Sequence, residues 1–283
     1  MDISSFKSIV KNYKVVFFDA FGVLKNSSGM LDNIHQTFEY LIANNIEFYI
    51  LTNDASRGPK SLAKSYQDAG LDMINENKII SSGMLAREYL QLKVNSGSVA
   101  YLGTKKSAHY LEETGLKALS LADLDINDID EVNALVFLDD EGFDWRSDLN
   151  KLSNLLRLRN IPVIVANTDK SYPVSNSEVA IAIGSIADMI EKITGRKFIK
   201  FGKPDSSMFI YAYNQVAANK GIEKNEILMV GDTLFTDIIG GNKFGIDTAL
   251  VLTGNTQAKH YKERILGMGI IPTYVCESAV IEE

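Results

Sequence analysis

Side chains that can do chemistry stand at four places along the chain, three of them directly after short apolar runs. These residues are Asp19, Thr52, Asn53, Lys203, Asp232 and Asp237. Ligand sites in open α/β sheets form beyond the carboxyl ends of the strands, so residues that follow such runs matter most. A single Asp or Thr at a strand end usually only caps a turn. The occurrence of all six residues in this order predicts that they share one site.

These residue types suit chemistry on a phosphate monoester. The negative charge of such an ester resists attack, so a site needs cations around its oxygens and a nucleophile held in line. Lys203 supplies one cation. A Mg²⁺ ion would supply the other, because an octahedral ion that prefers hard oxygen ligands suits Asp19, Asp232 and a backbone carbonyl.

The segments around these residues are specific. They read Phe-Phe-Asp-Ala-Phe-Gly-Val-Leu, Leu-Thr-Asn-Asp-Ala-Ser-Arg, Lys-Phe-Gly-Lys-Pro-Asp and Val-Gly-Asp-Thr-Leu-Phe-Thr-Asp-Ile. Over most of its length the chain resembles the haloacid dehalogenase superfamily, and within it the phosphatases of subfamily IIA. Members of that subfamily are NagD-like or p-nitrophenylphosphatase-like and carry a C2 cap.

The resemblance implies a role for each matched residue. Asp19 corresponds to the nucleophile, which forms an aspartyl-phosphate that water later hydrolyses. The Thr52 hydroxyl and the Asn53 backbone N–H would hold the oxygens that are not transferred, and Lys203 would bind phosphate and assist catalysis. The implied activity is hydrolysis of a small phosphorylated metabolite, for instance a sugar phosphate.

The resemblance also implies a magnesium site. Its ligands would be Asp19, Asp232 and the backbone carbonyl of Phe21. Asp237 is expected to organise metal-bound water or Lys203 rather than to bind the metal directly. A carboxylate at the start of the following helix is the plainer interpretation of Asp237.

One position departs from the pattern. Most phosphatases of this superfamily carry a second Asp two residues after the nucleophile, as general acid and base, and here that residue is Phe21. Such a group contributes roughly 10²- to 10⁴-fold to the rate. Three interpretations stay open: substrates with good leaving groups, an acid borrowed from the cap, or a phospho-ligand-binding and regulatory protein with little catalysis. Acid candidates in the cap are Asp139, Asp140, Glu141 and Asp169.

The elements that would position these residues alternate between strand and helix. Continuous apolar runs at 15–18, 48–51, 227–230 and 249–252 are typical of strands buried on both faces of a parallel sheet. Amphipathic stretches between them predict helices, one over 59–69 and one that begins near Thr236 and ends at Gly245. We therefore expect an α/β protein with a three-layer, doubly wound parallel-sheet core of the Rossmann-like type.

The spacing of the motifs predicts an insertion. The interval from Thr52 to Lys203 is far longer than the single βαβ step from Asp19 to Thr52. It leaves roughly 100 residues, enough for a small domain. We expect a core over 1–88 and 197–283 and an inserted α/β cap over 89–196. Strand candidates in the cap lie at 98–102, 134–138, 163–166 and 180–183, and Asp140, Asn167 and Asp169 are its candidate substrate contacts.

Composition excludes several classes of protein. The 283 residues are 46% hydrophobic and 23% charged with a net charge of −7, which argues against disorder and against nucleic-acid binding. The apolar runs are too short to span a membrane. The single cysteine, Cys276, and the lack of a signal-peptide core predict a cytoplasmic protein. The oligomeric state stays open, with a homodimer among the options.

Overall fold

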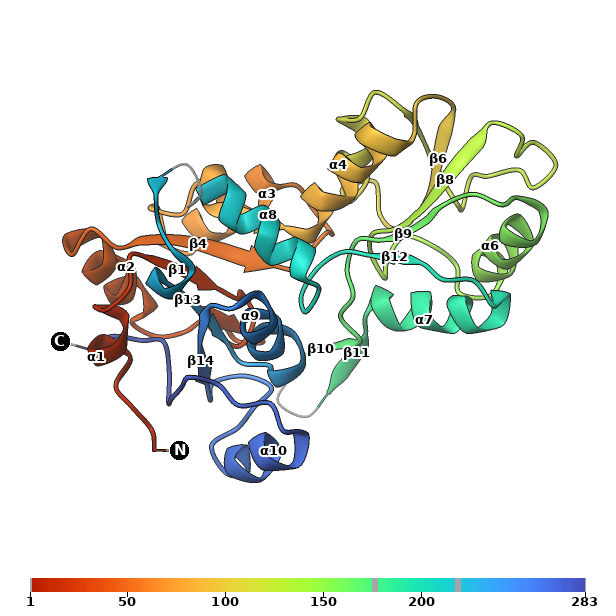
Figure 1. The fold of residues 1–283 in the computed structure, drawn as a ribbon. Coiled ribbons are helices and arrows are strands. Elements are labelled where there is room, and N and C mark those ends of the chain that lie inside the picture. The colour runs from red at the N-terminus through yellow and green to blue at the C-terminus, as the bar shows by residue number, and fades with distance from the viewer. Residues whose placement is uncertain (1, 175–177, 217–219, 283) are drawn as a thin grey trace. The chain divides into compact units, whose positions relative to one another are not determined.

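The computed structural model describes residues 2–174, 178–216 and 220–282, and their contacts divide the chain into two compact units (Figure 1). The first unit comprises Met1–Thr52, Pro59–Ile80 and Lys203–Glu283. The second comprises Asn53–Gly58 and Ser81–Gly202. The cap limits of 89 and 196 stay a prediction from motif spacing, and the contact-based division also assigns the short segment 53–58 to the second unit.

A parallel sheet forms the centre of the first unit. Its strand order is β15-β14-β13-β1-β4-β5. The strands are β1 (Val15–Phe18), β4 (Glu47–Thr52), β5 (Ile79–Ser81), β13 (Ile227–Gly231), β14 (Asp247–Val251) and β15 (Tyr274–Cys276). Phe18 is level with Val230 on one neighbouring strand and with Ile50 on the other. The residues that follow β1, β4 and β13 therefore emerge at the same edge of the sheet.

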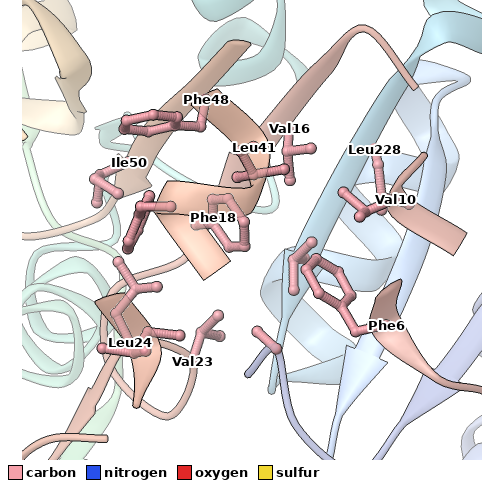
Figure 2. Packing of buried hydrophobic residues seen from close by; sticks show 14 of the residues in the cluster. Phe6, Val10, Val16, Phe18, Val23, Leu24, Leu41, Phe48, Ile50 and Leu228 are labelled. Carbon is pink, nitrogen blue, oxygen red and sulfur yellow. The ribbon is translucent and has the colours of Figure 1, made fainter. Parts of the chain in front are cut away.

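One face of this sheet packs against three helices. They are α1 (Phe6–Val10), α2 (Ile34–Ala43) and α3 (Pro59–Gln67). Alternate strand residues such as Phe18, Ile50 and Leu228 turn toward Phe6 and Leu41 and join them in one buried cluster (Figure 2). Burial of these large side chains is the main favourable free energy that holds the layer to the sheet.

The opposite face carries α8 (Ser206–Val216), the π-helical turn Leu234–Ile238 and α9 (Ile239–Phe244). Gly241 in α9 lies so close to Thr248 of β14 that an added Cβ would be 2.5 Å from its methyl group. A further helix, α10 (Tyr261–Met268), packs with Leu250 and Val275. Helices thus cover both faces, and the predicted three-layer α/β core is confirmed.

The second unit contains another parallel sheet, with the order β12-β9-β8-β6-β7. The strands are β6 (Ser98–Leu102), β7 (Lys117–Ser120), β8 (Val132–Phe137), β9 (Val163–Val165) and β12 (Ile199–Lys200). Its helices are α4 (Ser82–Lys93), α5 (His109–Glu112), α6 (Ser147–Leu158) and α7 (Ile183–Thr194). Apolar clusters lie on each side of the strands, one with α6 and α7 and one with α4 and α5.

Several local expectations need correction. The strand expected at 180–183 is β11 (Val179–Ile181), which pairs antiparallel with β10 (Ser171–Pro173) instead of joining the parallel sheet. The helix expected to start near Thr236 begins as the π-helical turn, and only then becomes α9, with Gly245 in the left-handed C-cap conformation. Near the start of the chain β2 (Lys25–Asn26) and β3 (Gly29–Met30) form a hairpin that the sequence analysis missed.

Short 3₁₀ turns precede two of the sheet strands, Glu76–Lys78 before β5 and Lys224–Glu226 before β13. Among the helices of the described residues, none combines the length and the apolar character needed to cross a membrane.

Candidate active site

Asp19 follows β1 at the sheet edge where the first unit gathers its polar side chains. Its Oδ1 accepts a hydrogen bond from the Ala20 N–H at 2.7 Å and lies 2.6 Å from the Lys203 ammonium. Within the described residues nothing hydrogen-bonds to Oδ2. The carboxylate is therefore fixed through one oxygen, and its role as a nucleophile stays a prediction.

Lys203 is the cation of this cluster. It is buried, and its Nζ lies 2.6 Å from Asp19 and 2.7 Å from Asp237 Oδ1. Burial alone would lower the pKa of Lys203, but attraction to Asp19 and Asp237 outweighs it and raises this pKa above its usual range. The side chain therefore remains an ammonium group.

Asp232 and Asp237 are also buried, and donors from Thr233 and from the loop after β14 hold them. Asp237 Oδ2 accepts from the Thr233 N–H at 3.1 Å. Asp232 accepts from the Asn255 N–H at 2.5 Å and from the Thr233 hydroxyl at 3.1 Å. Burial, followed by repulsion from Asp19, raises the pKa of Asp232. Burial also raises the pKa of Asp237, although Lys203 opposes that change.

The donor set fits a divalent cation. Asp19, Asp232 and Asp237 each offer a carboxylate oxygen, and these oxygens lie within 4.8 Å of one another. Lys203 offsets only one of the three charges, so the cluster is short of positive charge. Hard oxygen donors at this spacing suit Mg²⁺. Phe21 is half-buried in the turn after β1, and ligation by its carbonyl stays a prediction.

Glycines that the sequence analysis did not single out make room for the carboxylates. A Cβ on Gly22 or Gly254 would collide with the Asp232 carboxylate, and one on Gly231 would collide with Asp237. Gly22 also has φ +78°, a conformation that other residues adopt only with strain. Gly254 follows β14, so the strand-end argument that selected Asp19 also points to this loop.

The predicted phosphate-binding residues Thr52 and Asn53 fall on either side of the unit boundary. Thr52 ends β4 and is 6% exposed. Asn53 begins the segment assigned to the second unit, where its Nδ2 donates to Asp169 Oδ1 at 2.8 Å. The Ser82 hydroxyl donates to the Asn53 carbonyl at 3.0 Å. The binding roles of Thr52 and Asn53 stay predictions.

Residues of the predicted cap that are candidate acids, such as Asp139, or candidate substrate contacts, such as Asp140, Asn167 and Asp169, follow strands of the second unit. Asp139 and Asp140 follow β8, and they accept hydrogen bonds from Thr104 and Tyr172 respectively. After β9, Asn167 Oδ1 accepts from the Asp169 N–H at 2.9 Å. Each side chain therefore has a defined partner within its own unit, while its contact with substrate stays a prediction.

Family models match two parts of the chain. Residues 16–117 match a haloacid dehalogenase-like hydrolase, and residues 200–280 match a second model described as HAD-hydrolase-like. A crystal structure from Cytophaga hutchinsonii, described as a possible sugar phosphatase of the HAD superfamily, is 59% identical. The match covers 100% of both chains with a TM-score of 0.96. The chain therefore belongs to the haloacid dehalogenase-like hydrolases.

More distant relatives agree with the subfamily. An acid sugar phosphatase of Staphylococcus saprophyticus is 26% identical over 94% of this chain and 95% of its own. The glycerol phosphate phosphatase of Mycobacterium tuberculosis in complex with magnesium has a TM-score of 0.76 at 22% identity, covering 98% of this chain and 78% of that one. Structures related to NagD and 4-nitrophenylphosphatase share the fold. The relatives are named as phosphatases, so the alternative of a non-catalytic binder is not favoured.

Proposed function

We propose that this protein is a phosphatase that hydrolyses a small phosphate monoester, with a sugar phosphate as the preferred class of substrate. The observation that carries the proposal is the geometry of Asp19, whose Oδ1 is held by Lys203 while its Oδ2 lacks a partner among the described residues. The names of the acid sugar phosphatase and of the possible sugar phosphatase support the substrate class.

The proposed hydrolysis has two stages, and the chain's own residues supply the nucleophile and the groups that hold the phosphate. Asp19 Oδ2 attacks phosphorus, and the bond from phosphorus to the leaving alcohol breaks as the aspartyl-phosphate forms. Lys203 balances negative charge on the phosphoryl oxygens, and the Thr52 hydroxyl and Asn53 N–H orient them. Water then attacks the aspartyl-phosphate, which releases inorganic phosphate and restores the carboxylate.

Magnesium completes the charge balance in this proposal. Asp19 and Asp232 would hold the ion together with the Phe21 carbonyl, and Asp237 would organise its water or Lys203. A bound Mg²⁺ supplies Lewis-acid stabilisation of the phosphoryl oxygens. The excess of negative charge among these three carboxylates, two of which are buried, supports this assignment.

Phe21 shapes the choice of substrate. Because a phenyl ring donates no proton, the leaving oxygen takes its proton from water. In the chemical step alone, esters whose leaving groups are stable as anions, such as aryl phosphates, should therefore react faster than the proposed sugar phosphates, whose preference would rest on binding. The second unit serves as the cap in this proposal, and Asp140, Asn167 and Asp169 are its candidate substrate contacts.

Hydrolysis of an aryl phosphate and of a panel of sugar phosphates by purified protein tests the proposal. We expect turnover with Mg²⁺, its loss on chelation, and a loss of at least about 10³-fold in Asp19→Asn, which keeps the shape of the side chain but removes the nucleophile. Phe21→Asp should accelerate breakdown of the aspartyl-phosphate, followed by rapid quench. Turnover that survives Asp19→Asn would contradict the assignment of the nucleophile.

A further inference from the structure

The chain passes between its two units at points that coincide with the proposed phosphate-binding residues. One passage lies between Thr52 and Asn53 and another between Gly202 and Lys203. Thr52 and Lys203 belong to the first unit, and each is bonded covalently to a residue of the second. Whatever fixes Asn53 and Gly202 therefore constrains the backbone of two phosphate-binding residues.

Asn53 is fixed through its side chain. It is 2% exposed, and its Nδ2 donates to Asp169 Oδ1 at 2.8 Å and to the Thr168 hydroxyl at 3.5 Å. The Ser82 hydroxyl donates to its carbonyl at 3.0 Å. The contact with Asp169 is a short hydrogen bond to a charged acceptor, the stronger kind of hydrogen bond.

Gly202 lies against the other side of the Asn53 carboxamide. A Cβ at Gly202 would lie 2.6 Å from Asn53 Oδ1 and 3.0 Å from its Cγ, so only glycine fits without displacing Asn53. Gly202 also has φ +108°, outside the range that other residues adopt without strain. The Asn53 carboxamide therefore sits between Asp169 and the residue that precedes Lys203.

Asp169 is itself held in place. Its N–H donates to Asn167 Oδ1 at 2.9 Å, a turn formed by the asparagine side chain directly after β9. The close approach of Gly184 to the Asp169 carbonyl, which would lie 2.5 Å from an added Cβ, packs α7 against this turn. The Asp169 carboxylate therefore projects from a turn that is held in place after the end of β9.

The far end of the 53–58 segment is secured separately. The Tyr110 hydroxyl donates to the Arg57 carbonyl at 2.9 Å and lies 2.6 Å from the Ser81 hydroxyl, and the His109 ring lies against Gly58. The segment is therefore tied at both ends within the second unit, and Asn53 is the end that adjoins Thr52.

We propose that Asp169 is a positioning residue for phosphate binding, which acts through the Asn53 carboxamide on the backbone at Thr52 and Asn53. The proposal rests on the proposed function, since it assigns those residues to the phosphate. It assigns Asp169 a role different from the direct substrate contact that the sequence predicts. A positioning residue affects every phosphate ester alike, whereas a substrate contact affects some esters more than others.

Competitive inhibition by inorganic phosphate tests the proposal in the full-length protein. Because the lost hydrogen bond has a charged acceptor, we expect Asp169→Ala to raise the inhibition constant about tenfold. KM for an aryl phosphate and for a sugar phosphate should rise by the same factor. Asp169→Asn, which keeps a neutral acceptor for Asn53, should lose clearly less phosphate affinity than Asp169→Ala. Asp123→Ala, which removes an exposed carboxylate from the same unit, is the matched control.

A double-variant comparison shows whether the effect passes through Asn53. Asp169→Ala combined with Asn53→Ala should be no weaker in phosphate binding than Asn53→Ala alone. Additive losses, an effect confined to one ester, or an unchanged inhibition constant in Asp169→Ala would each overturn the proposal. A native protein that hydrolyses no ester would instead overturn the proposed function.

A spectroscopic measurement checks the contact without reference to activity. In protein labelled with ¹⁵N-asparagine, the carboxamide signal of Asn53 is assigned by its loss in Asn53→Ala. That signal should move in Asp169→Asn and stay in place in Asp123→Ala. A signal that does not respond to the change at Asp169 would contradict the positioning role even if Asp169→Ala fails to fold.

Discussion

Each unit places acidic side chains at the ends of its parallel strands, yet the two groups differ in how their charge is balanced. In the first unit Asp19 and Asp237 contact the buried ammonium of Lys203, and Asp232 belongs to the same cluster of carboxylates. In the second, Asp139 and Asp140 are half-buried, and within the described residues no ion pair reaches either of them; hydroxyl groups serve as their donors. In this molecule the acidic group with the two buried carboxylates is therefore the one that has a buried cation.

The cost of burial explains this difference. Removing a carboxylate from water is unfavourable unless an opposite charge and hydrogen bonds compensate for it. The first cluster has Lys203, backbone donors and close-fitting glycines. In the second unit the carboxylates retain some contact with water. Its acidic pair is consequently tolerated without a lysine, and we expect it to respond differently to mutation.

Removal of the lysine should produce the largest effect. Lys203→Met leaves buried carboxylates without their cation, so we expect a loss of roughly 3–5 kcal/mol in the free energy of unfolding, measured by urea denaturation with chelator present. Lys203→Met combined with Asp237→Asn should recover part of that loss. Lys64→Met, which breaks the exposed pair with Asp68, is the control and should cost at most about 1 kcal/mol. Equal losses in the two lysine variants would remove the distinction between buried and exposed charge.

Filling the space beside Asp232 should have an intermediate effect. Gly254→Ala forces its Cβ against the carboxylate, so we expect about 1–3 kcal/mol of destabilisation together with weaker magnesium binding, measured by titration calorimetry. Gly267→Ala is the matched control, because an added Cβ there meets nothing within 4 Å, and it should stabilise α10 by roughly 0.5–1 kcal/mol. Unchanged magnesium affinity in Gly254→Ala would show that the close fit is not needed.

The sequence predicted the strands of the first sheet well because they are buried on both faces. The apolar run 15–18 coincides with β1, and 227–230 falls within β13. Strand ends then located Asp19 and Asp232, since parallel strands bring their carboxyl ends to one edge. Two features could not be predicted from the sequence because they depend on tertiary contacts. They are the pairing of β11 with β10 and the π-helical turn around Asp237. That turn carries the Asp237 carboxylate, which accepts buried hydrogen bonds from the Lys203 ammonium and the Thr233 N–H.

The boundary between the two units could not be predicted from the sequence either, because it also depends on tertiary contacts. Motif spacing reveals that an insertion exists, but the assignment of 53–58 to the second unit depends on contacts such as those of Asn53 with Asp169 and of Arg57 with Tyr110. The sequence indicated only weakly that glycines would lie beside Asp232. Gly254 follows a predicted strand, but nothing in the local pattern shows that a carboxylate distant in sequence lies against it.

The smallest effect should come from the second unit, at Asp139. Burial, reinforced by repulsion from Asp140 and Asp54, raises the pKa of Asp139 to about 6, although the Thr104 hydroxyl opposes this. A carboxyl group whose pKa is higher in the folded state binds its proton more tightly there. Its favourable contribution to stability is therefore fully present below about pH 4 and is lost as the pH rises through about 6.

Asp139→Asn removes that dependence, because the amide stays neutral and still accepts from Thr104. Compared with the native protein, we expect the variant to gain about 1 kcal/mol in the free energy of unfolding at pH 7.5, a figure reduced for solvent screening, and almost nothing at pH 4. Urea denaturation across this range measures the difference. A gain in the free energy of unfolding that is the same at every pH would assign the stabilisation to packing and not to the charge of Asp139. The acidic residues of the two units would then differ only in their hydrogen bonds.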